Sequence, residues 1–197
     1  RLMPTERLLT MRNLHLLLGA VAVLLCGPGR PLLAQLVISE VVYDPVGVNT
    51  GRQVVEITNM GATEVQMGPS GYWLYFPQAR WQFPAGVAIP PQGVVRVNIN
   101  RPGTASATEF FTGISGMRAL KSKDALALFK SNLFADPAEI LDFVQWGSVG
   151  NGGEDVAISA GIWPSASFVA VTSLREGSSL AYDGTGDQPS DWCVDGS

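Results

Sequence analysis

LVISEVVYDP at residues 36–45 and GRQVVEITN at residues 51–59 are the two stretches that decide the fold of this chain. Both are rich in Val, Ile and Thr, residue types that suit the pleated, half-buried surface of a sheet. Asp44-Pro45, Gly47 and Asn49, which separate the two runs, can adopt the dihedral angles that reverse a chain. The sequence therefore predicts two β-strands joined by a turn.

The composition extends this prediction to the whole chain. Of 197 residues, 46% are hydrophobic and only 15% are charged, which is enough apolar material to bury a core. The 22 glycines and 13 prolines are scattered, as expected for short strands joined by turns. We predict an all-β domain over residues 36–197, preceded by a targeting segment in residues 1–34.

Residues 1–34 contain a pattern typical of a secretory signal peptide. Met11 is the expected start, Arg12 supplies the positive n-region, and residues 16–25 form an apolar h-region that leads to a small residue, Ala34. An uncleaved anchor is the alternative, but this run is much shorter than the roughly 20 apolar residues of a membrane-spanning helix. We expect cleavage near Ala34, no transmembrane segment afterwards, and a secreted, cell-surface or periplasmic location.

Further strands are expected wherever short apolar runs lie between turn residues. Residues 125–130 fit a strand or a helix by pattern, and their length and neighbours favour a strand. Regular alternation across 139–146 predicts one face made of Ile140, Asp142, Val144 and Trp146. A surface loop is expected at 101–116, interrupted by Phe110-Phe111. The other expected strands lie within 60–67, at 72–76, at two places within 81–99, at 167–173 and at 179–182.

The charge of the expected domain is acidic. From Leu36 onward there are nine basic and sixteen acidic residues, a net charge of −7. This balance disfavours electrostatic capture of nucleic acid or of an anionic membrane surface. Arg118, Lys121 and Lys123 form the one basic cluster, and a cluster of this size is more often a solvated loop.

Five stretches, taken in order, resemble a known family. They are VISEVVYDP at 37–45, QVVEITN at 53–59, FPAGVAIPPQG at 83–93, ILDFVQWG at 140–147 and PSDW at 189–192. Together they resemble the lamin tail domain, which is found in nuclear lamins and in many secreted bacterial proteins. The resemblance implies an immunoglobulin-like antiparallel β-sandwich. The chain departs from it at 67–73, where MGPSGYW replaces the family's Leu-Ser-Gly-Trp, and by this likeness we expect the protein to continue at both ends.

The residue inventory argues against several catalytic chemistries. The single histidine, His15, lies inside the expected signal, so a Ser-His-Asp or Cys-His arrangement is not expected in the mature protein. Zinc and copper sites are disfavoured for the same reason. Cys193, the one cysteine after Cys26, has no activating base nearby in sequence and reads as a packed or half-exposed small residue. We expect no enzymatic activity in this domain.

Glu40 and Glu56 are the paired carboxylates that could belong to a site. They lie on strands expected to be neighbours, so they could approach each other as the two carboxyl groups of a glycosidase do. The alternative is that both face solvent or accept hydrogen bonds from backbone groups, and the lack of a cleft signature favours it.

Calcium is the one metal for which the sequence offers ligands. Asp183, Asp187 and Asp191 alternate with glycines and a threonine and could surround the ion with oxygen atoms. The spacing does not match an EF-hand loop, and the same residues build ordinary Asx turns, which is the favoured interpretation. Glu154-Asp155 is a second, weaker candidate. No cofactor is otherwise expected.

Three functions remain open at this stage. The first is a secreted, non-catalytic interaction or surface-attachment module that binds a protein or cell-envelope component. The second is an accessory domain of a larger secreted enzyme, of nuclease or phosphatase type, whose catalytic domain lies outside residues 1–197. The third, a nucleic-acid-associated domain, is implied by the lamin resemblance and ranks last because of the negative charge.

Overall fold

The opening stretch forms the centre of the larger sheet. A computed structural model of the chain describes residues 36–68, 71–77, 79–113, 119–172 and 175–195. In it β1 (Leu36–Val42) and β2 (Val54–Asn59) pair antiparallel, which confirms the prediction of two strands and a turn. The expected signal peptide lies outside the described residues and stays a prediction.

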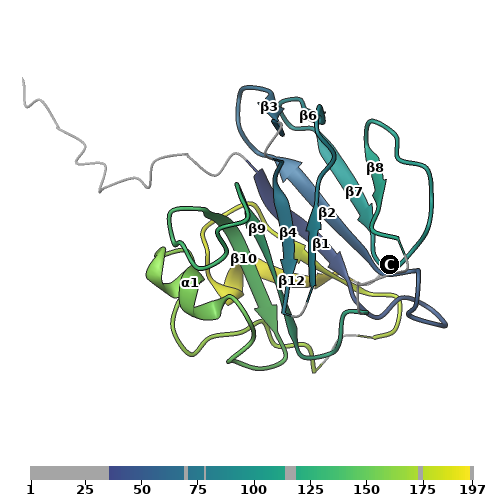
Figure 1. Cartoon of the computed structure of the whole chain (residues 1–197). Coiled ribbons are helices and arrows are strands. Elements are labelled where there is room, and N and C mark those ends of the chain that lie inside the picture. Colours follow the sequence, from purple (N-terminus) through teal and green to yellow (C-terminus); the bar gives the residue numbers. More distant parts are fainter. Residues whose placement is uncertain (1–35, 69–70, 78, 114–118, 173–174, 196–197) are drawn as a thin grey trace, which may run out of the picture. The chain divides into compact units, whose positions relative to one another are not determined.

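Six strands form this sheet, in the order β12, β11, β1, β2, β7, β8 (Figure 1). The four others are β7 (Val94–Asn98), β8 (Glu109–Phe111), β11 (Ser179–Tyr182) and β12 (Trp192–Asp195). All neighbours run antiparallel except β7 and β8, which are parallel. The sheet therefore joins the first and last described strands of the chain.

Four strands form the second sheet, in the order β10, β9, β4, β5 (Figure 1). They are β4 (Trp73–Phe76), β5 (Ala79–Gln82), β9 (Asp124–Phe129) and β10 (Ile140–Trp146). The short strands β3 (Val65–Gln66) and β6 (Ala88–Ile89) pair with each other.

The inward-facing residues of the two sheets share one core. Along β2, Val55 and Ile57 are fully buried, whereas Glu56 between them is half-buried on the other face. Leu74 and Phe76 of β4 belong to the same buried cluster. Burial of these side chains holds the sheets face to face as a β-sandwich, because removing apolar surface from water drives their association. The all-β prediction is confirmed.

The second sheet is also covered on its outer face. Every residue of β9 is buried. The helix α1 (Glu154–Ser159) packs against β10, and the Trp163 and Phe143 rings pack edge to face with centroids 5.5 Å apart. Phe134 packs on Phe129 with centroids 5.3 Å apart. Burial on both faces explains why residues 125–130 show no alternation, although the strand prediction there is confirmed.

Two β-bulges interrupt the regular alternation. One lies in β1 between Ile38 and Glu40, and the other lies in β10 between Ile140 and Asp142. The face predicted for residues 139–146 is therefore interrupted at Leu141, because a bulge adds one residue to one strand of a pair. The Asp142 carboxylate receives the backbone N–H of Ile38 at 2.6 Å, which joins the two bulged strands across the sandwich.

A buried amide fixes the end of β1 to a distant loop. Gln53, only 1% exposed, donates through Nε2 to the backbone oxygens of Tyr43 and Leu120. Its Oε1 accepts the backbone N–H of Leu120 at 2.7 Å. These bonds satisfy polar groups that would otherwise be buried without partners.

Several elements differ from the sequence predictions. Residues 167–172 form a single bridge, between Val169 and Trp146, in place of a strand. The six-residue helix α1, the 3-10 turn η1 (Pro189–Asp191) and the strand β12 were not expected. Within the described part of 101–116, residues 101–108 form the expected exposed loop, and Phe110 and Phe111 lie in β8.

Candidate functional site

The outer face of the six-stranded sheet carries a row of charged side chains, which we call the charged row: Glu40, Glu56, Arg96 and Glu109. The strand register creates it, because Glu40 pairs with Glu56, Glu56 with Arg96, and Arg96 with Glu109. Each is followed by a buried apolar residue, namely Val41, Ile57, Val97 and Phe110, so alternation directs all four outward. The prediction that Glu40 and Glu56 lie on neighbouring strands is confirmed.

We call this outer surface of β11, β1, β2, β7 and β8 the open face, and it contains a shallow hollow. The hollow has a volume of about 230 Å³. It is lined by Glu40, Val42, Val54, Glu56, Arg96, Gly177 and Ser179. Its lining thus combines carboxylates with two valines, one cation and one hydroxyl.

Ser179 lies deep in the hollow. Ala181, two residues further along β11, pairs with Glu40 on β1. Because side chains alternate along a strand, Ser179 points to the same outer face as Ala181 and Glu40. The residue is only 6% exposed, and its side chain forms no hydrogen bond with any part of the chain that the structure describes. Its hydroxyl, which can donate one hydrogen bond and accept others, is therefore available to a bound group.

The two carboxylates of the hollow lie opposite each other, and one of them also lies opposite a guanidinium. Burial raises the pKa of the Glu56 carboxyl above its ordinary value, the facing Glu40 raises it further, and Arg96 lowers it. No hydrogen bond or ion pair to Glu40 or Glu56 is present among the described residues. Like charges directly opposite each other on neighbouring strands are destabilising, so a cation placed here would be stabilising.

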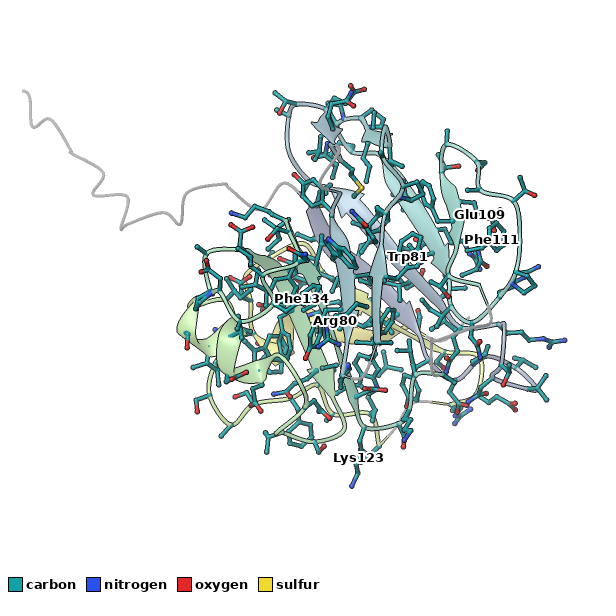
Figure 2. All side chains as sticks on the ribbon, in the orientation of Figure 1. Arg80, Trp81, Glu109, Phe111, Lys123 and Phe134 are labelled. Carbon is teal, nitrogen blue, oxygen red and sulfur yellow. The ribbon has the colours of Figure 1, made fainter. Side chains whose placement is uncertain are left out.

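The far end of the charged row is already internally bonded. Glu109 Oε1 accepts Asn98 Nδ2 at 2.9 Å, and Asn98 Oδ1 accepts Arg101 Nη1 at 3.3 Å. Arg101 also lies over the Phe111 ring, 5.8 Å from its centroid. Figure 2 shows Glu109 and Phe111 together on β8. Glu109 is therefore less available than Glu40 or Glu56 for an external ligand.

Gly177, which lines the hollow, is bonded to the turn between β1 and β2. Gly177 donates its N–H to the Asp44 oxygen at 2.8 Å, and Gly47 donates to Glu176 Oε1 at 2.6 Å. A Cβ at Gly177 would lie 2.7 Å from Val46 Cγ2, and the residue has φ +90°, so a glycine is required here. The tip of this turn leaves Val46 and Val48 exposed.

The outer face of the other sheet is covered in part by the chain itself, at β9 and β10. Arg80 stacks over the Tyr75 ring at 3.8 Å and over the Phe134 ring at 4.9 Å. Figure 2 shows Arg80 beside Phe134, away from Glu109 and Phe111. These cation–π contacts use the cation internally.

Glu40 and Glu56 lie on the outer face of the sheet, in a hollow that they share with two valines and Arg96. Because both carboxylates are on the same face, a cation bound in the hollow would be attracted to both. Of the two alternatives left by the sequence, the solvent-facing one is the arrangement that the structure describes.

The calcium candidates lie in a turn that uses their oxygens internally. Asp183 Oδ1 accepts both the backbone N–H and the hydroxyl of Thr185 at 2.8 Å, as in an Asx turn. Asp191 Oδ2 accepts the N–H of Gln188 at 2.7 Å. Among the described residues, which include Asp187, no group of three or more His, Cys, Asp or Glu side chains is placed to hold a metal ion. The calcium site stays a prediction.

The remaining sequence candidates lie apart from the hollow. Cys193 is exposed on β12, and its Sγ lies 3.4 Å from the Ala181 oxygen. The backbone N–H of Lys121 donates to the Asp124 carboxylate, and the backbone oxygen of Lys121 accepts a hydrogen bond from Trp146 Nε1. Arg118 lies outside the described residues.

Sequence reasoning missed Arg96 and Ser179. Arg96 is the polar residue within the alternating run VVRVN at 94–98, so the pattern shows that it faces outward. Its position opposite Glu56 depends on pairing β7 with β2, and that of Ser179 depends on pairing β11 with β1. Neither pairing can be read from one strand alone.

Comparison of the chain with protein-family models and with curated proteins gives no significant match. Over the described residues, no helix has both the length and the apolar character needed to cross a membrane. The class of protein that fold and site define is a β-sandwich with one open, charged sheet face.

Proposed function

We propose that this protein is an exported, non-catalytic binding module of the lamin tail type, which attaches to a protein or cell-envelope component through its open face. The observation that carries the proposal is an asymmetry between the two sheets. The outer face of β9 and β10 is covered by the chain, whereas the outer face of β1 and β2 carries two carboxylates and one guanidinium in a hollow. A sheet face that the chain leaves uncovered is available as a contact surface, and complementary charges on a partner would favour its docking there.

The sequence supports the class assignment. The five stretches that resemble the lamin tail family fall on β1, on β2, on the segment from β5 to β7, on β10 and on the segment from η1 to β12. We propose on this basis that the sandwich is immunoglobulin-like. Export rests on the signal pattern that begins at Met11.

The negative charge of the charged row makes nucleic acid a less favourable partner than a cationic or neutral molecule. Three carboxylates and one guanidinium make up the charged row, so its net charge is negative. A phosphate backbone would be repelled there, since nucleic-acid binding is dominated by contacts between cations and phosphates.

A sedimentation assay tests the proposed function. The full-length purified protein is mixed with a bacterial envelope fraction containing wall and membrane, and the bound share is measured. We expect binding that is lost on Glu40→Lys together with Glu56→Lys and kept on Asp155→Lys, which reverses a charge on the exposed side of α1. Absence of binding by the unaltered protein, or equal loss in both variants, contradicts the proposal.

A further inference from the structure

We propose that the hollow on the open face binds a primary ammonium group on an aliphatic stem, such as a lysine side chain of the partner. This inference rests on the proposed binding role of the open face and names the chemistry that the face recognises.

Three acceptor groups line the hollow. Glu40 and Glu56 contribute carboxylates, and Ser179, a residue that is 6% exposed, contributes a hydroxyl with no hydrogen-bond partner among the described residues. An ammonium group carries three N–H donors and no acceptor. The number and kind of groups in the hollow therefore match those of one ammonium.

The apolar part of the lining accounts for the stem. Val42 and Val54 face each other on β1 and β2 and line the same hollow as the two carboxylates. A four-carbon stem can lie along these valines while its charged end reaches the carboxylates, as lysine stems do on apolar surfaces. The volume of about 230 Å³ exceeds what a bare ion needs and leaves room for such a stem.

A calcium ion fits this lining less well. Calcium takes six to eight oxygen ligands at about 2.3–2.6 Å. Only Glu40, Glu56 and Ser179 offer side-chain oxygens in the hollow, and Arg96 brings a positive charge to its edge. An ammonium group can keep its distance from Arg96, because its stem lets it enter from the opposite side, near Gly177.

The electrostatics of the hollow agree with this occupant. Burial and the facing Glu40 raise the pKa of Glu56 by more than Arg96 lowers it, so two ionised carboxylates are costly there and a further positive charge is favourable. A bound ammonium would supply that charge in a partly desolvated place, where its hydrogen bonds to carboxylates are strong.

The test is a backbone-amide NMR titration of the full-length protein with Nα-acetyl-lysine N-methylamide. Its matched control ligand is Nα-acetyl-norleucine N-methylamide, which has an aliphatic stem without the ammonium. We expect saturable shifts at Val42, Val54 and Ser179 with the lysine compound alone. A third titration with calcium chloride distinguishes a metal site from an amine site.

Variants locate the binding. Glu40→Gln and Glu56→Gln are each expected to weaken the lysine compound about tenfold, as loss of one charge-assisted bond implies. Ser179→Ala is expected to weaken it less, and Asp155→Asn, which removes one negative charge elsewhere, should leave it unchanged. Thermal unfolding of each variant shows that it remains folded.

Three results overturn the inference: equal shifts with the norleucine compound, saturable shifts with calcium but none with lysine, or lysine shifts that do not depend on Glu40 and Glu56. Failure here is distinct from failure of the proposed function. Envelope binding that needs the open face would still stand if the lysine compound did not bind, and the partner would then offer a different group.

Discussion

The backbone N–H of Ile38 donates a hydrogen bond of 2.6 Å to Asp142 Oδ2, so a carboxylate on one sheet holds the central strand of the other. Asp142 Oδ1 also accepts the N–H of Phe143 at 2.9 Å. Both bulges lie at this contact. A bulge leaves a backbone donor without a ladder partner, and the carboxylate satisfies it.

Asp142→Ala should lower the free energy of unfolding by about 2 kcal/mol, because a charge-assisted hydrogen bond is lost and the Ile38 N–H is left half-buried without a partner. Urea unfolding followed by tryptophan fluorescence measures the change. Asp155→Ala, on the exposed side of α1, is the control and should change stability by less than about 0.5 kcal/mol. Equal values for the two variants would show that the contact between the sheets contributes nothing.

Gln53→Ala should destabilise the fold by about 3 kcal/mol, since the backbone groups of Tyr43 and Leu120 lose their buried partner. Gln66→Ala is the matched control, because Gln66 is exposed and bonds only to Glu64 among the described residues. The same urea measurement applies. A loss below about 1 kcal/mol at Gln53 would mean that water replaces the amide at little cost.

Gly147→Ala and Gly150→Ala separate a steric clash from backbone strain. Both glycines have positive φ, +74° and +81°, which costs an alanine about 1–2 kcal/mol. A Cβ at Gly147 would also collide with the backbone oxygen of Ser122, whereas a Cβ at Gly150 meets nothing within 4 Å. We expect Gly147→Ala to shift the unfolding midpoint clearly further. Equal shifts would mean that the Ser122 loop yields freely.

The raised pKa of Glu56 gives stability a defined pH dependence. The pKa of the Glu56 carboxyl is raised above its ordinary value of 4.5 in the folded state, so between that value and the raised pKa the folded state binds more protons than the unfolded state. The contribution of Glu56 is therefore present below pH 4.5 and is lost as the pH rises through the raised folded pKa.

Glu56→Gln removes this dependence. The variant should match the unaltered protein in stability near pH 4 and exceed it near pH 7, as measured by urea midpoints at each pH. Asp155→Asn is the control and should show no such gain. A Glu56→Gln protein that is less stable than the original at pH 7 would mean that the attraction of Arg96 outweighs burial and repulsion by Glu40.

The sequence predicts most of the strands but little of the site. Runs such as Val54–Asn59 alternate cleanly, because one face is buried and the other is not. The bulge at Leu141 could not be predicted, since it depends on which strand β10 pairs with. The closing strand β12 was missed because it follows a turn of polar residues and is only four residues long.

The candidate site illustrates the same limit. The sequence places Glu40 and Glu56 on adjacent strands, and their opposition follows once those strands pair. Ser179 lies more than 100 residues from either glutamate in the chain, and only the return of β11 to the edge of β1 brings it to the hollow. A long-range pairing of this kind leaves no local signal in the sequence.

Carboxyl footprinting tests most directly whether the open face is the binding surface. The full-length protein is labelled at its carboxylates with a carbodiimide and an amine, with and without the envelope fraction, and labelling at each residue is read by mass spectrometry. We predict that the envelope fraction lowers labelling of Glu40 and Glu56 severalfold and leaves Asp155 unchanged. Protection of Asp155 with unchanged labelling at Glu40 and Glu56 would contradict the account.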